Sequence, residues 1–263
     1  MTQLQGDGLT VRRGGRVILD SVSITAANGA FVGVIGPNGA GKSTLLACLA
    51  GLLKPDAGAV SLDGATLGAL GGRALARRRA YLPQSARAEW PVSVERLVAL
   101  GLTPLLPAFG GLPQAMTDRV TRVLNEVDLL DRRDQPATTL SGGELARAML
   151  ARAMVGDPDL LIADEPLAGL DPRHALDCVA RLRGLAEAGK LVIASLHELT
   201  LAARATTHIA VLRDGRLVAF GPTAATLTSS LLRDAFDVDA CVTGAGHPYA
   251  MVDFVAAPVS PSA

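Results

Sequence analysis

The residues most able to do chemistry form a glycine-rich loop that carries one lysine and two hydroxyl groups. The loop reads Gly36, Pro37, Asn38, Gly39, Ala40, Gly41, Lys42, Ser43 and Thr44, and it fits the pattern G-x-x-x-x-G-K-[ST] without a mismatch. Glycines let several backbone N–H groups face one anion, and a helix starting near Lys42 points its positive end at the same place. The loop therefore predicts binding of nucleotide phosphates, with Lys42 on the outer phosphates and Ser43 on Mg²⁺.

The residues before this loop support that interpretation. Phe31 to Ile35 is an apolar run of strand length, which is the context that the motif requires. With this flank, a phosphate-binding loop is favoured over a plain glycine turn between a strand and a helix.

A second apolar run, from Leu160 to Ala163, ends in two carboxylates and a proline, Asp164, Glu165 and Pro166. Ligands of a parallel sheet bind beyond the carboxyl ends of its strands, so both acids are expected beside the phosphate loop. Asp164 suits the Mg²⁺ shell and Glu165 suits polarisation of an attacking water. Alone, an acidic strand end is more often a solvated edge, and the intact loop upstream reverses that preference.

Two further polar residues follow predicted strands. Gln84 comes after Tyr81-Leu82-Pro83, and His197 comes after the apolar run 191–195. An amide can ligate a metal or sense a γ-phosphate, and a histidine at the same sheet edge can bridge that phosphate and the water. Taken singly, Gln84 could be a surface residue and His197 a structural one.

The segment Leu140-Ser141-Gly142-Gly143-Glu144 opens a helix predicted to run through 145–154. Ser141 and Glu144 have the spacing of a capping box, which by itself is a sufficient structural explanation for both. It does not explain Gly142 and Gly143, since paired glycines weaken a helix start unless a backbone must approach an anion closely. The pair predicts a second phosphate-binding helix end.

Composition excludes several classes of protein. The chain has 263 residues with 25 basic and 25 acidic side chains, so nothing indicates a nucleic-acid partner. Hydrophobic residues make up 49%, yet no apolar run approaches the roughly 18 to 20 residues that span a bilayer. The N-terminus lacks the pattern of a secretory signal. Three widely spaced cysteines, expected to be small buried groups, favour a reduced cytosolic setting.

Around these motifs the pattern predicts an α/β fold. Short apolar runs at 9–11, 17–19 and 22–24 suggest a small antiparallel sheet, and strands alternating with helices after 160 suggest a mainly parallel one. Helical spacing broken by Pro and Gly marks a helical subdomain at about 86–155, with buried positions at 120, 123, 124 and 127. We expect one domain over 1–240 and a C-terminal extension over 241–263, partly disordered and frayed over 256–263.

In this order, the motifs resemble the nucleotide-binding subunits of ABC transporters over nearly the whole chain. The resemblance implies a P-loop ATPase core with a mainly parallel sheet, an N-terminal antiparallel β-subdomain and an inserted helical subdomain. It also implies family roles for the motifs: Walker A at 36–44, the Q-loop residue at Gln84, the signature at 140–144, the Walker B acid at Asp164, the catalytic base at Glu165, the D-loop at Leu170-Asp171 and the switch histidine at His197.

The resemblance further implies partners. Ser141 and Gly143 of one subunit would close over ATP held by the other, so two copies of this chain would form a homodimer. Permease subunits would bind the dimer at the cytoplasmic face of the membrane, and an extracellular or periplasmic substrate-binding protein would act indirectly. The alternative is a soluble ABC-type ATPase not tied to transport, for example one acting on ribosomes or chromosomes.

A narrower likeness points to importers of iron-siderophores, haem and cobalamin. It rests on Glu144 in place of the commoner Gln and on the stretches 90–94 and 98–101. Trp90 would either pack against a permease helix or lie in the core. One position departs from the family, since Arg13 stands where an aromatic residue usually stacks on adenine; a guanidinium can also stack, with looser base selectivity.

Overall fold

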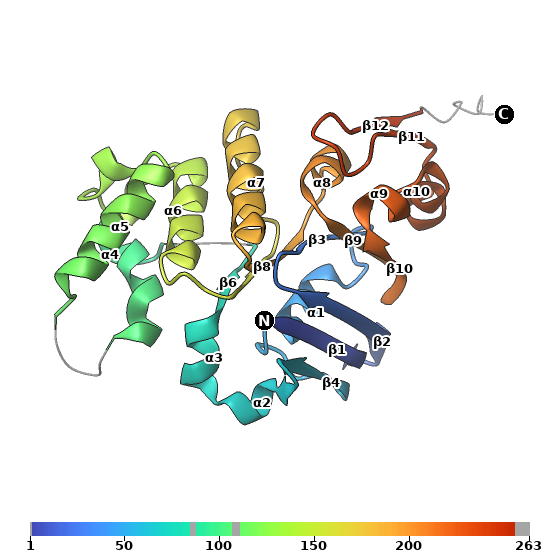
Figure 1. The fold of residues 1–263 in the computed structure, drawn as a ribbon, viewed down its shortest axis with the longest axis horizontal. Coiled ribbons are helices and arrows are strands. Elements are labelled where there is room, and N and C mark those ends of the chain that lie inside the picture. Colours follow the sequence, from blue (N-terminus) through green and yellow to red (C-terminus); the bar gives the residue numbers. More distant parts are fainter. Residues whose placement is uncertain (1, 85–87, 107–110, 256–263) are drawn as a thin grey trace.

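A six-stranded sheet forms the centre of the molecule in the computed structural model, which describes residues 2–84, 88–106 and 111–255 (Figure 1). Its strands lie in the order β10 (Arg216–Pro222), β9 (His208–Arg213), β3 (Phe31–Ile35), β8 (Leu191–Ser195), β7 (Leu160–Ala163) and β6 (Arg79–Leu82). Only β10 runs antiparallel to its neighbour, and the other pairings are parallel. The mainly parallel sheet predicted from the sequence is confirmed.

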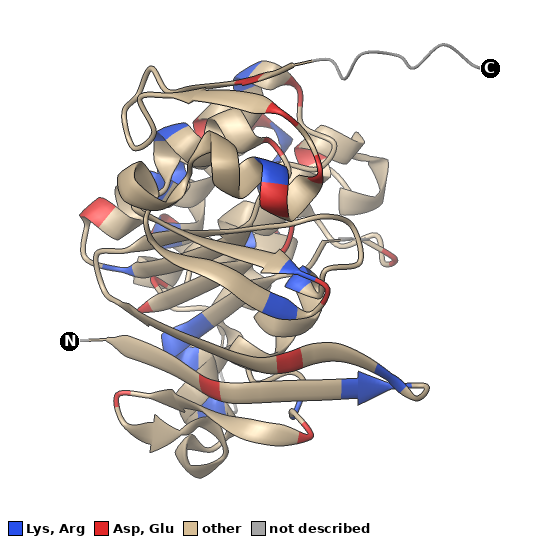
Figure 2. Cartoon of the chain, turned by 90° about the vertical axis from the view of Figure 1, so that its right-hand side faces the viewer, with Lys and Arg blue, Asp and Glu red and all other residues tan. Residues whose placement is uncertain are grey.

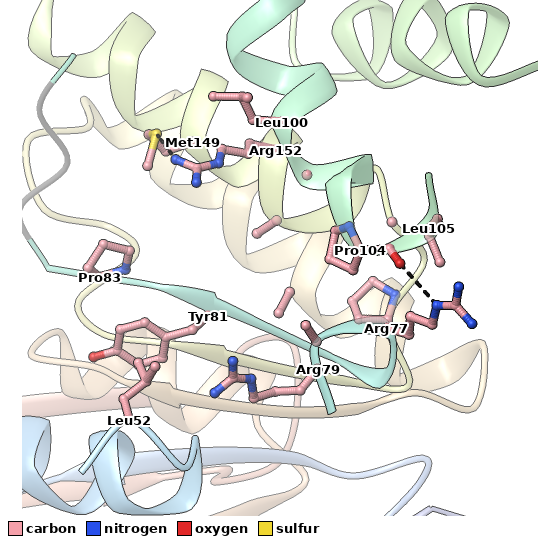
Figure 3. Close-up of a pocket in the computed structure, with 16 residues that line it drawn as sticks. Leu52, Arg77, Arg79, Tyr81, Pro83, Leu100, Pro104, Leu105, Met149 and Arg152 are labelled. Carbon is pink, nitrogen blue, oxygen red and sulfur yellow. Dashed lines mark hydrogen bonds between the residues drawn. The ribbon is translucent and has the colours of Figure 1, made fainter. Parts of the chain in front are cut away.

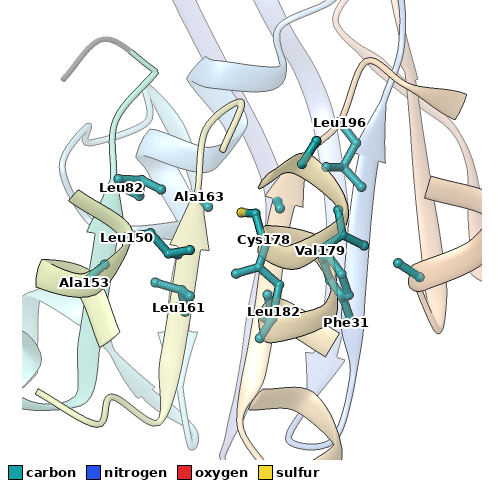
Figure 4. Packing of buried hydrophobic residues seen from close by; sticks show 14 of the residues in the cluster. Phe31, Leu82, Leu150, Ala153, Leu161, Ala163, Cys178, Val179, Leu182 and Leu196 are labelled. Atoms are coloured by element: carbon teal, nitrogen blue, oxygen red, sulfur yellow. The ribbon is translucent and has the colours of Figure 1, made fainter. Parts of the chain in front are cut away.

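The strands β3 and β7 are apolar and buried throughout, because both faces of the sheet are covered. Successive residues of β7 enter two different cores: Leu160 and Ile162 join one, and Leu161 and Ala163 join the other. On the first face lie α1 (Lys42–Leu49) and the N-terminal sheet; on the second lie α6 (Gly142–Met154), α7 (Pro172–Glu187) and α8 (Leu199–Ala205). Figure 4 shows part of the second core, with Leu150 of α6 and Cys178, Val179 and Leu182 of α7 beside β7.

The N-terminal sheet is antiparallel, with strands in the order β2 (Arg16–Ala27), β1 (Gln3–Arg13), β4 (Ala57–Leu62) and β5 (Ala65–Thr66). The runs at 17–19 and 22–24, expected as separate short strands, are parts of one strand, β2. Ser21 separates them with a φ of 52°, where the pairing shifts register between Leu9–Val22 and Val11–Leu19. The polar break in the sequence is therefore a bulge and not a turn.

Among the described residues between β6 and β7, the regular elements are helices, and they form the lobe at the left of Figure 1. They are α4 (Val94–Ala99), η1 (Leu100–Leu105), α5 (Gln114–Glu126), η2 (Leu130–Arg132), η3 (Ala137–Thr139) and α6. The predicted apolar face is confirmed, since Val120, Val123, Leu124 and Val127 are all buried. Trp90 is 75% exposed, which removes the alternative that it belongs to the core.

Short helices α2 (Leu67–Leu70) and α3 (Gly72–Arg78) precede β6, and α9 (Thr223–Thr226) and α10 (Ser229–Phe236) follow β10. The chain then forms a hairpin of β11 (Ala240–Thr243) and β12 (Met251–Phe254). The hairpin is tied to α8, because Arg204 Nε donates to the Ala250 carbonyl at 2.7 Å. Residues 241–255 of the predicted C-terminal extension thus lie beside α8; the part expected to fray, 256–263, lies outside the described residues.

The surface and the cysteines bear on other expectations. Basic and acidic residues are interspersed over the face shown in Figure 2. No helix in the described part of the chain is long and apolar enough to cross a membrane. Cys48 and Cys178 are buried as expected, whereas the expectation is wrong for Cys241, which is exposed at the start of the C-terminal hairpin.

Candidate active site

The phosphate loop connects β3 to α1 and has a backbone that only glycine can follow at two positions. Gly36 and Gly41 have φ angles of 151° and 99°. A Cβ at Gly36 would lie 2.1 Å from the Leu212 carbonyl oxygen of β9, and one at Gly41 would lie 2.8 Å from that of Ile18 in β2. The helix α1 begins directly after Gly41 without a side-chain cap. Its first N–H groups are therefore available to an anion.

Lys42 folds back over this loop. Its side chain is buried, with 6% of its surface exposed, and Nζ donates to the carbonyls of Gly36 at 2.7 Å and Pro37 at 3.0 Å. Burial lowers the pKa of the Lys42 ammonium, and the charges of Glu165 and Asp164 partly offset that effect. Because an ammonium has three donors, one remains for a phosphate oxygen at this place.

The two carboxylates follow β7, as predicted, and differ in environment. Asp164 is 3% exposed, and its Oδ1 accepts a hydrogen bond of 2.7 Å from Ser195 Oγ, the last residue of β8. The same Ser195 oxygen accepts from the backbone N–H of Glu165 at 2.7 Å. Glu165 itself has a φ of 50°, so the chain turns sharply between the two acids. Asp164 thus points inward and is fixed, and Glu165 begins a loop.

Sequence reasoning missed Ser195. The available signal was a hydroxyl at the end of the otherwise apolar run 191–195, the same arrangement that marked Asp164 after 160–163. Its partners are separated from it by 30 and 31 residues, so nothing local in the sequence indicates the contact.

Glu165 is paired with His197. Nε2 of His197 lies 2.6 Å from Oε1 of Glu165, and since a carboxylate only accepts, Nε2 carries the proton. Burial raises the pKa of Glu165, but hydrogen bonds from His197 and Gln84 and the charges of His197 and Lys42 outweigh it, so the net pKa is lowered. The carboxylate is therefore held in its anionic form, as a general base requires.

Four neighbouring strands, β3, β8, β7 and β6, are thus each followed by at least one polar side chain at the same edge of the sheet. Lys42 follows β3, Gln84 follows β6, Asp164 and Glu165 follow β7, and His197 follows β8. Hydroxyl, amide and carboxylate oxygens of Ser43, Gln84 and Asp164 are the hard donors that Mg²⁺ takes, so the chemistry of the donor set fits that ion.

The second glycine pair lies at the start of α6. Ser141 caps the helix together with Glu144 in a complete capping box, as predicted. Within the described residues, a Cβ at Gly142 would meet nothing within 4 Å, so packing inside the chain does not demand this glycine. Gly142 and Glu165 border one cavity of about 160 Å³, which places the start of α6 near the loop that follows β7.

The remaining predicted residues lie on exposed turns. Arg13 is exposed at the end of β1, next to the turn made by Gly14 and Gly15. Asp171 caps α7, where its Oδ1 accepts from the His174 backbone N–H at 2.9 Å.

Comparison with known proteins gives consistent results. A family model described as ABC transporter matches residues 19–168. The hemin import ATP-binding protein HmuV of Rhodopseudomonas palustris is 42% identical over 247 residues, which is 90% of either chain. That of Bordetella pertussis is 41% identical over 254 residues, 93% of this chain and 95% of the relative.

Solved structures agree with this match. The ATP-binding subunit of an ABC transporter superimposes with a TM-score of 0.76 at 28% identity, covering 89% of this chain and 93% of the other. The dimeric structure of a bacterial ABC transporter cassette gives 0.76 at 26% identity, covering 83% and 98%.

Proposed function

The chain belongs to the ABC transporter family as an ATP-binding subunit that couples ATP hydrolysis to transport, and on this premise we propose that its cargo is hemin, taken up by an importer. The observation that carries the proposal is the end-to-end similarity to hemin import ATP-binding proteins, at 41 to 42% identity. It favours hemin over the siderophore and cobalamin classes suggested by the sequence. The same similarity argues against the alternative of a soluble ATPase not tied to transport.

The proposed hydrolysis assigns one role to each polar group at the sheet edge. The loop 36–44 and the start of α1 hold the phosphates, with Lys42 on the outer ones. Glu165 takes the proton of the attacking water, and His197 holds that carboxylate through Nε2 at 2.6 Å. As the expected switch histidine, His197 would lie beside the γ-phosphate. Ser43, Gln84 and Asp164 would hold Mg²⁺, which would neutralise phosphate charge.

The proposed active unit is a homodimer at the cytoplasmic face of a membrane. Ser141, Gly142 and Gly143 of one protomer would close over ATP held by the partner, with Asp171 and Arg13 also near nucleotide. Two observations support this: the open space around Gly142, and the similarity to a cassette that was solved as a dimer.

We assign the permease contact to a cleft of about 380 Å³ where the helical lobe meets β6 (Figure 3). Leu52, Tyr81, Leu100 and Met149 line it with apolar surface, and Arg77 closes one end by donating to the Pro104 carbonyl at 3.0 Å. Trp90 is exposed in the same helical lobe. The wall of the cleft continues through Pro83 to Gln84, which contacts Glu165. A cytoplasmic helix of the permease bound in this cleft would therefore respond to movements of Gln84 that accompany ATP binding and hydrolysis beside Glu165.

Two measurements test the function together. A tagged chain is purified from membranes and its co-purifying membrane protein is identified; the pair is then reconstituted into vesicles to measure ATP-dependent uptake. We expect hemin uptake that the Glu165→Gln variant abolishes. Uptake of cobalamin or a ferric siderophore in preference to hemin would overturn the proposed cargo, and a permease that exports would overturn the proposed direction.

A further inference from the structure

A chain of three side chains connects α6 to the start of α7. Nη1 of Arg147, one turn into α6, contacts Nε2 of His174. Nδ1 of the same imidazole lies 2.7 Å from Oδ2 of Asp171, the residue that caps α7. Arg147 belongs to α6, whereas Asp171 and His174 stand at the start of α7, where the loop that follows β7 ends. The contact therefore joins α6 to the far end of that loop.

The chemistry of the three groups fixes the proton on the imidazole. A guanidinium can only donate, so Nε2 of His174 must accept from Arg147. Nδ1 then carries the proton and donates to the Asp171 carboxylate. Nε of Arg147 is buried and has no hydrogen-bond partner among the described residues. The hydrogen bond from Nη1 to His174 therefore holds the guanidinium in place. The link requires a residue that accepts on one side and donates on the other.

Packing around the link leaves little room for the two elements to move separately. Gly143 lies against the loop, since a Cβ there would come 3.6 Å from the Gly169 carbonyl oxygen. Below it, Leu150 of α6 and Pro166 and Leu170 of the loop line a cavity of only about 10 Å³, which is about the space of one water. A shift of the α6 start must therefore move the loop that begins at Glu165.

We propose that His174 is a positioning residue that transmits closure of the signature end of α6 to the loop 165–171. This rests on the proposed function, in which Ser141 and Gly143 bind the partner's nucleotide and Glu165 acts on the protomer's own. Through this link, hydrolysis of the ATP bound to a protomer's own loop 36–44 depends on whether the same protomer's Ser141 and Gly143 contact the ATP of the partner. Binding of ATP to the loop 36–44 does not involve it.

The test compares three substitutions of His174 in the full chain. Glutamine can accept from Arg147 through its oxygen and donate to Asp171 through its nitrogen, whereas alanine can do neither and asparagine is too short to reach Arg147. We expect His174→Ala and His174→Asn to lower kcat by about 2- to 30-fold, with unchanged affinity for a fluorescent ATP analogue. His174→Gln should restore most of the rate, and His247→Ala, at an exposed loop position, serves as the control.

A double-mutant cycle completes the test. If the link acts as a unit, Arg147→Ala combined with His174→Ala should be no slower than either single variant. Wild-type kcat in His174→Asn, equal loss in the glutamine and alanine variants, or strictly additive losses would overturn the proposal. If His174→Ala does not fold, the asparagine and glutamine variants decide the outcome. Failure of the proposed dimeric active unit would look different, because Glu165→Gln would then not form an ATP-bound dimer, whichever residue stands at position 174.

Discussion

The hydroxyl of Ser195 joins the two acids of the candidate active site, donating to Asp164 Oδ1 at 2.7 Å and accepting from the Glu165 backbone N–H at 2.7 Å. Ser195 is fully buried and Asp164 is nearly so. A buried carboxylate must be hydrogen-bonded to remain tolerable in its ionised form. One hydroxyl therefore orients the proposed metal-binding acid and anchors the turn that presents the proposed base.

Substitution of Ser195 by alanine should affect both stability and activity. The change leaves a buried carboxylate oxygen and a buried N–H without their partner, which costs about 1–3 kcal/mol of unfolding free energy. Thermal and urea unfolding measure that loss, and steady-state ATP hydrolysis should fall with it. Ser61→Ala, on β4 of the antiparallel sheet, is the matched control. A Ser195→Ala variant as stable and active as wild type would show that Asp164 finds its hydrogen bond elsewhere.

Removal of the proposed base should separate binding from turnover. In Glu165→Gln the amide keeps the size of the side chain but cannot take a proton from water, so kcat should fall by at least about 100-fold. ATP affinity should be retained, and the chain should accumulate as an ATP-bound dimer in size-exclusion chromatography. Because the pKa of Glu165 is lowered, the wild-type carboxylate stays ionised down to acid pH, and its protonation should not limit hydrolysis near neutrality. Full hydrolysis by the variant would refute the assignment.

A structural feature could be predicted from the sequence when the residues that form it are close together in the chain. The loop 36–44, the strand 160–163 and the capping box at Ser141 were predictable because glycine geometry, apolar runs and a three-residue spacing are each written in consecutive residues. The bulge at Ser21 was not, since it depends on the pairing register with β1. The contacts of Ser195 and His174 were also hidden, because each joins residues that only the packed fold brings together.

The base specificity of the nucleotide site should depend on Arg13. A guanidinium stacks on a purine less selectively than an aromatic ring, so the wild-type chain should prefer ATP over GTP only slightly. Arg13→Tyr should tighten ATP binding by about 2- to 10-fold, as measured by competition with a fluorescent nucleotide. Arg12→Tyr is the control, because neighbouring strand residues point to opposite faces. Strong discrimination by the wild-type chain would count against this role.

The three thiols should differ in reactivity. Burial raises the pKa of Cys48 to about 11 and that of Cys178 to about 12, whereas Cys241 is exposed. Since the thiolate is the reactive form, a thiol reagent at pH 8 should label one cysteine in the folded chain and all of them after unfolding. The buried thiols keep their protons above the unfolded pKa of about 8.5, so their contribution to stability is lost as pH rises from there toward 11. Rapid labelling of Cys178 in the folded state would contradict its burial.

Lys42 should make the stability of the nucleotide-free protein depend on pH in the opposite sense. Burial lowers its pKa below the unfolded value of about 10.4, so between the two values the unfolded chain binds more protons and stability rises with pH. Lys42→Met removes this dependence, and its stability relative to wild type should therefore decline as pH is raised toward 10. Lys54→Met, at an exposed site, should show no such trend.

The same Lys42 variant tests nucleotide binding in one further measurement. A ligand at 100 times its Kd stabilises the folded state by about 2.7 kcal/mol, so ATP should raise the melting temperature of wild type and of Lys54→Met. Lys42→Met should show little or no shift, because the variant lacks the ammonium group that reaches the outer phosphates. The rest of the phosphate loop, including the Gly36 carbonyl that accepts from Lys42 Nζ at 2.7 Å, is unchanged in the variant. A full thermal shift in Lys42→Met would mean that the backbone of the loop binds the phosphates without its lysine.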